Sequence, residues 1–401
     1  MGEFTVIIPT ATRYIESVGG SARLAGLIVG TRALGTALIQ PLIGVPLKKY
    51  PLKRIMLCLC GVNFAGSILY ALGGLTGSVA TIIVARVIQG LGSGPTWMST
   101  YVTRTTSTDL RSTYMQYLSL SVGLGYGVGP FFGAALYALC DRRGLDLHGK
   151  VFNAYTSPGW LWALFFVVEF LLLKAFMIEP EKSKAANALG GAPAPDKTGI
   201  PWRRLFLIFP IISLVPLNVG GWDVHTVLLG EQRFGWSIVA TALYLGGLNW
   251  LAVPAGLIPA STYVGPSEDR CGVLGAFGLL LAATACFWNY GGPVASRAIV
   301  YGVGSVALLV ASLFAKSFSW SLVSKQPPPE HRTYVMACNS GAYMFGRGCG
   351  ATVAGFLPPG DAFAIFLLAV EAFAIVYILV LWRYLTIPEG NSSSESTHVP
   401  A

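Results

Sequence analysis

The chain has 401 residues, of which 54% are hydrophobic and only 11% are charged. Soluble domains carry about 25% charged residues, so this composition and the mean hydropathy of +0.62 exclude a disordered protein, a nucleic-acid-binding domain and an ordinary cytosolic enzyme. They predict an all-α polytopic membrane protein. The net charge of +9 comes from basic residues in short loops, a pattern that reports orientation in a membrane and not a nucleic-acid partner.

The first predicted element is too short to cross a membrane. Residues 3–17 contain Pro9 and Arg13 and would extend about 22 Å as a helix, whereas the hydrocarbon core is about 30 Å thick. We interpret this segment as the second half of a first spanning helix whose beginning is truncated. The alternative is a short interfacial segment.

Apolar runs of about 20 residues, the length that a spanning helix needs, follow along the chain. Counted with the short first segment they predict twelve spans. The eleven full-length runs cover residues 22–47, 55–75, 79–103, 114–139, 158–178, 204–228, 236–260, 271–290, 298–323, 334–357 and 362–386.

A polar segment rich in Ala, Gly and Pro divides the spans into two sets of six, which is typical of a linker. We therefore expect an N-terminal six-helix half over residues 1–178, a linker over 179–202, a C-terminal half over 203–386 and a disordered tail over 387–401. With the linker and tail in the cytoplasm, sixteen Lys and Arg residues fall on that side and seven on the other, as the positive-inside rule requires.

The two halves repeat each other. The sequence RSTYM begins at Arg111 and RTYVM begins at Arg332, 221 residues later. Glycines follow each arginine at 14, 16 and 18 positions, so that Gly129 corresponds to Gly350. Because each half holds six spans, equivalent helices face the same way, which predicts a parallel repeat about an axis along the membrane normal.

Twelve spans in two six-helix halves resemble the major facilitator superfamily. The sequence RVIQGLGSG, which contains Arg86 and Gly90, is similar to the fourth-helix motif of that family. The sequence GLGYGVGPFFG, which contains Gly129 and Pro130, is similar to its antiporter-type fifth-helix motif. The resemblance implies the major-facilitator fold of two six-helix bundles and a monomeric secondary carrier that works by alternating access.

Within the superfamily the chain resembles the lysosomal and vacuolar branch, which includes the neuronal-ceroid-lipofuscinosis-type transporter and carriers fused to SPX domains. The residues behind this are FNAYTSP before the sixth run, Asp223 ahead of FGW, and RGCG from Arg347. The resemblance implies an endolysosomal or vacuolar membrane. One departure concerns the loop after the second run, where Gly44 is present but Lys48 stands in place of the family's acid, so the cytoplasmic latch of that acid is not implied here.

Besides Arg86, three cations inside predicted spans are candidates for a substrate site, because ionisable groups are costly there and mark functional sites. Arg32 is in the second run, Lys316 in the tenth and Arg347 among the glycines of the eleventh. Since a buried guanidinium favours an anion, we predict that these residues make a cationic substrate cavity. The alternatives are snorkelling or a carbonyl contact for Arg32, and pairing with an acid across the domain interface for Arg347.

Asp223 and His225 stand in the seventh run within GGWDVH. A carboxylate and an imidazole can exchange protons near neutral pH, so we predict that this pair couples transport to protons. The alternative is a luminal helix end at which both groups are hydrated. Glu169 and Glu371 lie in the sixth and twelfth runs, for which we expect packing or lipid-edge roles.

A further set of residues fits gating or structural roles. Glycine ladders let helices approach closely and, near proline, let them hinge. An arginine at the fourth-helix motif would order the cytoplasmic helix ends. These residues are Gly44, Arg86, Gly90, Arg111, Gly129, Pro130, Arg332 and Gly350.

The function predicted from these features is secondary active transport of a small solute, an anion or organic anion, by alternating access with proton coupling. The alternatives are a channel-like anion conductor on the same fold and a truncated or non-transporting membrane protein. The sequence has no nucleotide-binding motif, no nucleophile–base pair and no metal-ligand spacing among its seven cysteines and four histidines, so we expect no enzyme activity, no cofactor and no metal. The expected partners are the solute and the lipid bilayer, without nucleic acid.

Overall fold

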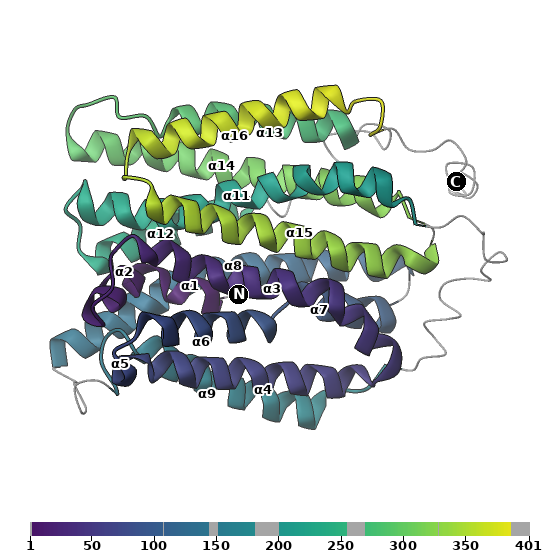
Figure 1. Ribbon diagram of the computed structural model, residues 1–401, viewed down its shortest axis with the longest axis horizontal. Coiled ribbons are helices and arrows are strands. Elements are labelled where there is room, and N and C mark those ends of the chain that lie inside the picture. Colours follow the sequence, from purple (N-terminus) through teal and green to yellow (C-terminus); the bar gives the residue numbers. More distant parts are fainter. Residues whose placement is uncertain are drawn as a thin grey trace.

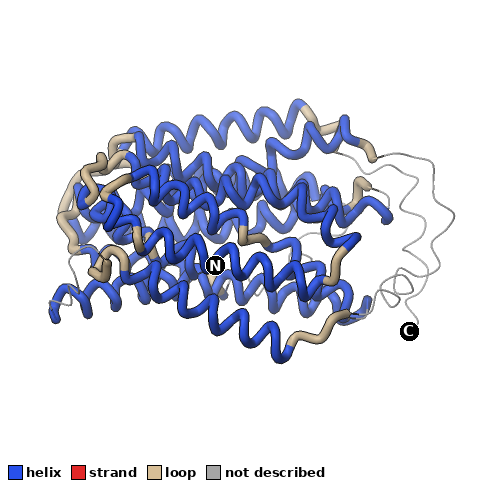
Figure 2. The backbone as a smooth tube through the Cα atoms, turned by 60° about the horizontal axis from the view of Figure 1, so that its bottom comes forward, coloured by secondary structure: helices blue, strands red, loops and turns tan. Residues whose placement is uncertain are grey.

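A computed structural model of the protein describes residues 2–106, 108–143, 151–180, 200–254, 269–327 and 329–385. Within these ranges the chain forms helices and no strand. Figure 2 shows the longer helices running side by side along one direction, with loops gathered at the two ends. An all-helical chain satisfies its backbone hydrogen bonds internally, which is what the membrane interior demands.

The helices that precede the linker form one group. They are α1 (Gly2–Val6), α2 (Ile8–Ser17), α3 (Leu24–Lys49), α4 (Leu52–Ala71), α5 (Gly73–Thr76), α6 (Val79–Leu91), α7 (Pro95–Thr105), α8 (Thr108–Arg143) and α9 (Ser157–Phe176). Four of them, α3, α4, α8 and α9, have 20 residues or more, and the other five are shorter helices next to breaks in the chain.

The helices after the linker form the second group, which lies beside the first in Figure 1. They are α11 (Trp202–Gln232), α12 (Ile238–Ala252), α13 (Asp269–Ala285), α14 (Val294–Ser324), α15 (Pro329–Phe356) and α16 (Asp361–Val380). We call the end of the bundle at which α9 ends and α11 begins the linker end, and the opposite end the far end. The linker over residues 181–199 and the tail after residue 385 lie outside the described residues.

Helix contacts in the two groups follow one pattern. In the first group α1 packs on α8, α3 on α6, and α4 on both α6 and α9. In the second group α11 packs on α15, α12 on α14, and α13 on both α14 and α16. The groups meet through α3 against α15 and through α8 against α12. In each contact the second helix of one half packs on the fifth helix of the other. This reciprocal arrangement is what a parallel two-fold repeat produces.

Each of the twelve predicted spans corresponds to a helix or a pair of helices. By length and apolarity alone, seven helices of the described chain could cross a membrane. The chain is therefore a multi-pass membrane protein, while the count of twelve spans stays a prediction. The seven are Leu24–Ile43, Leu52–Ala71, Ser121–Asp141, Ser157–Phe176, Trp202–Gln232, Val294–Ser324 and Asp361–Val380.

The predicted run over residues 79–103 is broken into α6 and α7, a correction with a clear cause. Pro95 opens α7 and has no N–H to continue the helix ladder. The carbonyls that the break sets free find side-chain donors on neighbouring helices. Asn63 Nδ2 donates to Gly92 O at 2.8 Å, and Gln40 Nε2 donates to Ser93 O at 3.3 Å. Such compensation makes a broken helix tolerable inside a membrane.

Glycines bring α3 and α15 together at the contact between the two groups. A Cβ on Gly26 would lie 2.7 Å from the Cα of Gly355, and the reverse substitution gives the same distance. Gly30 and Gly348 continue the contact toward the linker end, where a Cβ on Gly30 would lie 2.5 Å from Gly348 O. Small residues of this kind let helix backbones approach closely in membranes, so this contact tolerates no side chain.

Candidate functional site

A cavity of about 140 Å³ lies between the two groups of helices. The first group contributes α8, and the second contributes α11, α12, α14 and α15. Its wall is mostly apolar, with a small set of polar and cationic side chains, which is the usual composition of a solute site. These side chains are Tyr126, Asn249, Ser312, Lys316, Tyr343 and Arg347.

Arg347, in the wall of the cavity, contacts residues of both groups of helices. Its guanidinium donates to Asp223 Oδ2 at 2.5 Å, and both side chains are buried. The guanidinium also lies over two rings of the first group, 4.6 Å from the centroid of Phe4 and 4.3 Å from that of Tyr126. Its Nε is buried and has no hydrogen-bond partner within the described part of the chain. The acid that pairs with Arg347 thus belongs to its own group, while the aromatic contacts cross the interface.

The repeat places Tyr126 and Arg347 at equivalent positions, because they are 221 residues apart on α8 and α15. These two residues contact each other across the interface. A residue can touch its own repeat partner only near the axis that relates the halves. Arg347 therefore lies at the centre of the protein, where carriers with repeated halves bind their solutes.

Lys316 reaches the same cavity from α14. Its Nζ lies 5.1 Å from the ring centroids of both Trp320 and Tyr343. Among the described residues no carboxylate lies within ion-pair distance of this ammonium. Cation–π contacts hold the group in place without neutralising it. Lys316 is therefore an unbalanced positive charge at the edge of a largely apolar cavity.

Arg32 is not among the residues that line this cavity, and its guanidinium is held by partners in the first group of helices. Its guanidinium donates to Glu3 Oε2 at 2.7 Å and to Ser93 Oγ at 2.9 Å. It also lies 5.7 Å from the ring centroid of Phe4. The Phe4 ring thus contacts the arginines of two buried ion pairs, Glu3–Arg32 and Asp223–Arg347. Sequence reasoning overlooked Glu3; an acid in the short first segment was the available signal.

Asp223 and His225 point to different partners. Residues two apart on a helix do not share a face, so Asp223 meets Arg347 while His225 turns toward α14 and α16. His225 Nε2 accepts the N–H of Gly360 at 3.0 Å, which places the ring proton on Nδ1, 3.1 Å from Tyr301 Oη. The imidazole also stacks on Phe363 at 4.1 Å between ring centroids. His225 thus connects α11 with α14 and with the start of α16 in the buried interior.

A scan against protein-family models matches residues 1–324 to the Major Facilitator Superfamily. The chain belongs to the major facilitator superfamily. Three solved structures share its fold: the human organic anion transporter MFSD10 (TETRAN), a bacterial homologue of the human lysosomal transporter Spinster, and a D-xylose–proton symporter. Their TM-scores are 0.65, 0.66 and 0.67, their identities 17%, 17% and 13%, and the matches cover 94%, 96% and 97% of this chain and 95%, 92% and 97% of theirs.

Curated relatives include two proteins named as MFS-type transporters. One uncharacterized MFS-type transporter of Schizosaccharomyces pombe is 22% identical over 95% of this chain and 78% of its own length. Another from that yeast is 29% identical over 42% of this chain and 37% of its own length. An SPX domain-containing membrane protein of Arabidopsis thaliana is 26% identical over 44% of this chain and 24% of its own length. The chain therefore spans well under half the length of the latter two.

The glycine ladders of this superfamily member act at helix contacts. A Cβ on Gly129 would overlap Thr5 and Gly2 O of the first segment, and one on Gly350 would overlap Leu217 O of α11. Each ladder therefore fits the fifth helix of its half against the first. Gly90 plays the same part between α6 and α3, where a Cβ would lie 2.9 Å from Gly35 Cα. Pro130 lies inside α8 beside Gly129.

Arg86 binds helices together in the far half of the bundle, not at the linker-end termini that we expected it to order. Its Nη1 donates to Gln89 Oε1 at 2.6 Å and its Nε to Ile28 O at 3.4 Å. Its guanidinium also lies 5.9 Å from the ring centroid of Tyr70. It is fully buried and is not among the residues that line the central cavity, which fits a structural role.

The remaining predicted residues lie at the linker end or at the periphery. Arg332 is exposed in the first turn of α15. At Gly44 and Arg111 only the backbone is described, so the roles of both residues stay predictions. Glu371 is buried on α16 and accepts a hydrogen bond from Thr284 of α13 at 2.7 Å, which is a packing contact. Within the described ranges no cluster of His, Cys, Asp and Glu could hold a metal ion.

Proposed function

We propose that the protein is a secondary active transporter that moves a small organic anion through the central cavity by alternating access, as a monomer and without enzyme activity. The observation that carries this proposal is that Lys316, which has no acidic partner among the described residues, and Arg347 line the same largely apolar cavity at the interface of the two halves. Two cations with one acid leave an excess positive charge, and an ionisable residue at this depth is a functional hypothesis by default. The human organic anion transporter with the same fold is consistent with this solute class.

The cavity also suggests the kind of anion. Tyr126, Tyr343 and the aliphatic wall offer apolar contact beside the two cations, while Asn249 and Ser312 can donate or accept hydrogen bonds. A solute with one carboxylate and a small apolar body would satisfy all of these groups. A bare inorganic ion would leave the apolar wall without contacts.

The Asp223–Arg347 pair provides a means of proton coupling. While Asp223 is ionised, it occupies Arg347 and competes with the solute. Protonation of Asp223 would release the guanidinium for the anion, so proton and anion would bind together. Binding that is mutually favourable in this way couples the two fluxes. The sequence prediction assigned this role to Asp223 and His225 jointly; we now propose it for Asp223 with Arg347.

We further propose an endolysosomal or vacuolar membrane as the location. The support is the lysosomal transporter whose bacterial homologue shares the fold. The linker end would then face the cytoplasm, as the distribution of basic residues predicts.

The test is transport by the purified chain in proteoliposomes, with solid-supported-membrane currents recorded for small carboxylates, phosphate and chloride. A carrier saturates and shows counterflow, whereas a channel gives current that rises linearly with driving force. Lys316→Gln should raise the KM for the carboxylate about tenfold or more, the value of one charged hydrogen bond. Lys325→Gln is the matched control, because that lysine lies at the linker end and pairs with Asp269. Unchanged KM in Lys316→Gln would contradict the proposal.

A further inference from the structure

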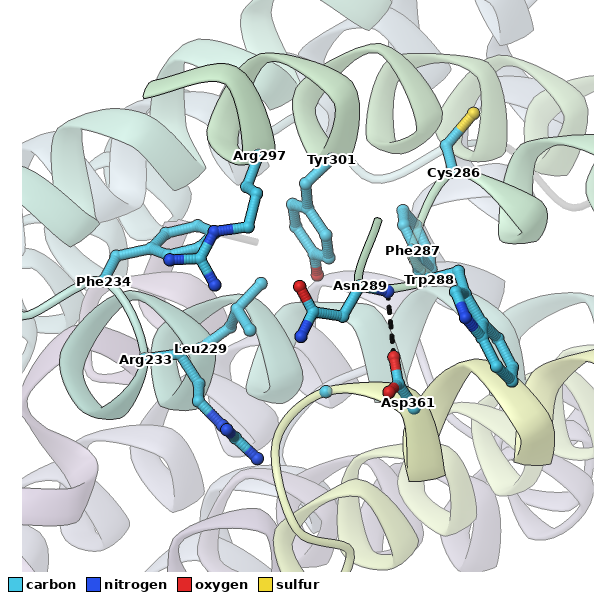
Figure 3. Close-up of a pocket in the computed structure, with 11 residues that line it drawn as sticks. Leu229, Arg233, Phe234, Cys286, Phe287, Trp288, Asn289, Arg297, Tyr301 and Asp361 are labelled. Carbon is cyan, nitrogen blue, oxygen red and sulfur yellow. Dashed lines mark hydrogen bonds between the residues drawn. The ribbon is translucent and has the colours of Figure 1, made fainter. Parts of the chain in front are cut away.

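A second cavity lies at the far end of the C-terminal group and shares no lining residue with the central one. It has a volume of about 50 Å³ and is formed where α11 ends, α13 ends, α14 begins and α16 begins. Figure 3 shows its lining side chains, with Arg297 and Tyr301 on one side, Asp361 on another and Asn289 projecting between them. A volume of this size suits a single small ion.

Two arginines of this cavity have no acidic partner among the described residues. Arg297 lies with its guanidinium 5.6 Å from the ring centroid of Phe234, and its Nε is buried without a hydrogen-bond partner. Arg233 donates through Nε to Pro359 O at 3.1 Å, which leaves its terminal nitrogens available. A buried donor without a partner is costly, and Arg297 Nε is such a donor among the described residues. Arg233 is exposed and adds a second positive charge beside it, so the two arginines together favour a group that can accept from both guanidinium groups.

The one acid among the described residues of the same wall cannot balance both arginines. Asp361 Oδ1 accepts the backbone N–H of Asn289 at 2.8 Å, the bond drawn dashed in Figure 3. Asn289 Oδ1 in turn accepts the N–H of Gly291 at 3.3 Å, so the side-chain NH₂ of Asn289 remains as a donor. Two arginines against one aspartate leave one excess positive charge around the cavity.

We propose that this far-end cavity binds a small oxyanion, with Arg233 and Arg297 as its charged ligands and Asn289 Nδ2 as a neutral donor. Guanidinium groups present planar pairs of N–H donors that match the oxygens of sulfate, phosphate and carboxylate. A halide ion has no oxygens to match these forks. The site lies at helix ends and not in the central cavity, so its anion is separate from the solute proposed there.

The test is binding of radiolabelled sulfate to the full chain in lipid nanodiscs, with phosphate, acetate and chloride as competitors. Arg297→Gln and Arg233→Gln should each weaken sulfate binding about tenfold or more. Arg297→Lys keeps the charge and loses the planar pair of N–H donors, so its affinity for sulfate should lie between those of the wild type and Arg297→Gln. Phosphate or acetate should displace sulfate at lower concentration than chloride does.

Two control variants separate this site from other cations. Arg23→Gln removes an exposed far-end arginine outside the cavity and should leave sulfate binding unchanged. Lys316→Gln removes the central-cavity cation and should also leave it unchanged, whatever that variant does to transport. Arg233 is exposed and makes one backbone contact, so Arg233→Gln should fold even if Arg297→Gln does not.

Several results would overturn the proposal. Wild-type affinity in Arg233→Gln would remove that arginine as a ligand. Loss of sulfate binding in Lys316→Gln would place the anion in the central cavity. Chloride that competes as well as phosphate would exclude an oxyanion site, and no displaceable sulfate on the wild-type chain would exclude any site.

Discussion

Asp223→Asn should give the central cavity, at every pH, the solute affinity that the wild type has when Asp223 is protonated. Asp223 is the carboxylate that pairs with Arg347, at 2.5 Å, and both side chains are buried. Asparagine keeps the shape and one acceptor oxygen but removes the charge. The Arg347 guanidinium then keeps its contacts with Phe4 and Tyr126 and is free to bind the anionic solute.

The magnitude follows from the bond that is lost. A hydrogen bond between charged groups is worth about 1.5–3 kcal/mol, and every 1.4 kcal/mol is a factor of ten in affinity. In the wild type the solute must displace Asp223 while that carboxyl is ionised, so its affinity should rise on acidification. In Asp223→Asn it should stay at the acidic value, which is about 10- to 150-fold tighter than that of the wild type at alkaline pH.

The assay is the KM for a small carboxylate, from solid-supported-membrane currents over a series of pH values. The matched control is Glu371→Gln, since Glu371 is a buried carboxyl of the same half that bonds Thr284 and not a cavity cation. The control should keep the pH dependence of the wild type. If Asp223→Asn also keeps it, the Asp223–Arg347 pair does not couple protons to the solute.

Two further predictions concern the packing and the first segment. Gly346→Ala should lower the free energy of unfolding by about 2 kcal/mol, because its Cβ would overlap Ser213 O, whereas Gly275→Ala, with nothing within 4 Å, should be neutral or raise it by up to about 1 kcal/mol. Thermal denaturation of both purified variants measures this, and equal melting temperatures would refute the close contact. Arg32→Ala should destabilise the protein by about 3–5 kcal/mol because it leaves the Glu3 charge buried and unpaired, and adding Glu3→Gln should recover part of the loss. A double variant that is no more stable than Arg32→Ala in the same melting assay would show that the two side chains act independently.

The superfamily and its general architecture could be read from the sequence because they depend on local patterns. A spanning helix needs a run of apolar residues and little else, so the runs appear in the structure as helices, with several ends that differ from the predicted ones. The last residues of the run over 236–260 lie outside the described ranges. The correspondence of Gly129 with Gly350 could also be predicted from the sequence, because close contact between helices requires glycine in both halves. The local signal failed in the run over residues 79–103, where the break before Pro95 depends on donors from Asn63 and Gln40 on other helices.

The sequence alone also identified Arg347, Lys316 and Asp223 as functional candidates, since ionisable side chains are rare inside a membrane. Which of them meet was decided by the tertiary structure. Asp223 and His225 are near neighbours in the chain, yet helix geometry turns them to different partners, and Asp223 instead finds Arg347 on α15. Arg32 was expected in the same cavity and is held by Glu3. Charge and apolarity are properties of single residues, whereas the sign and balance of a cavity depend on which distant helices pack together.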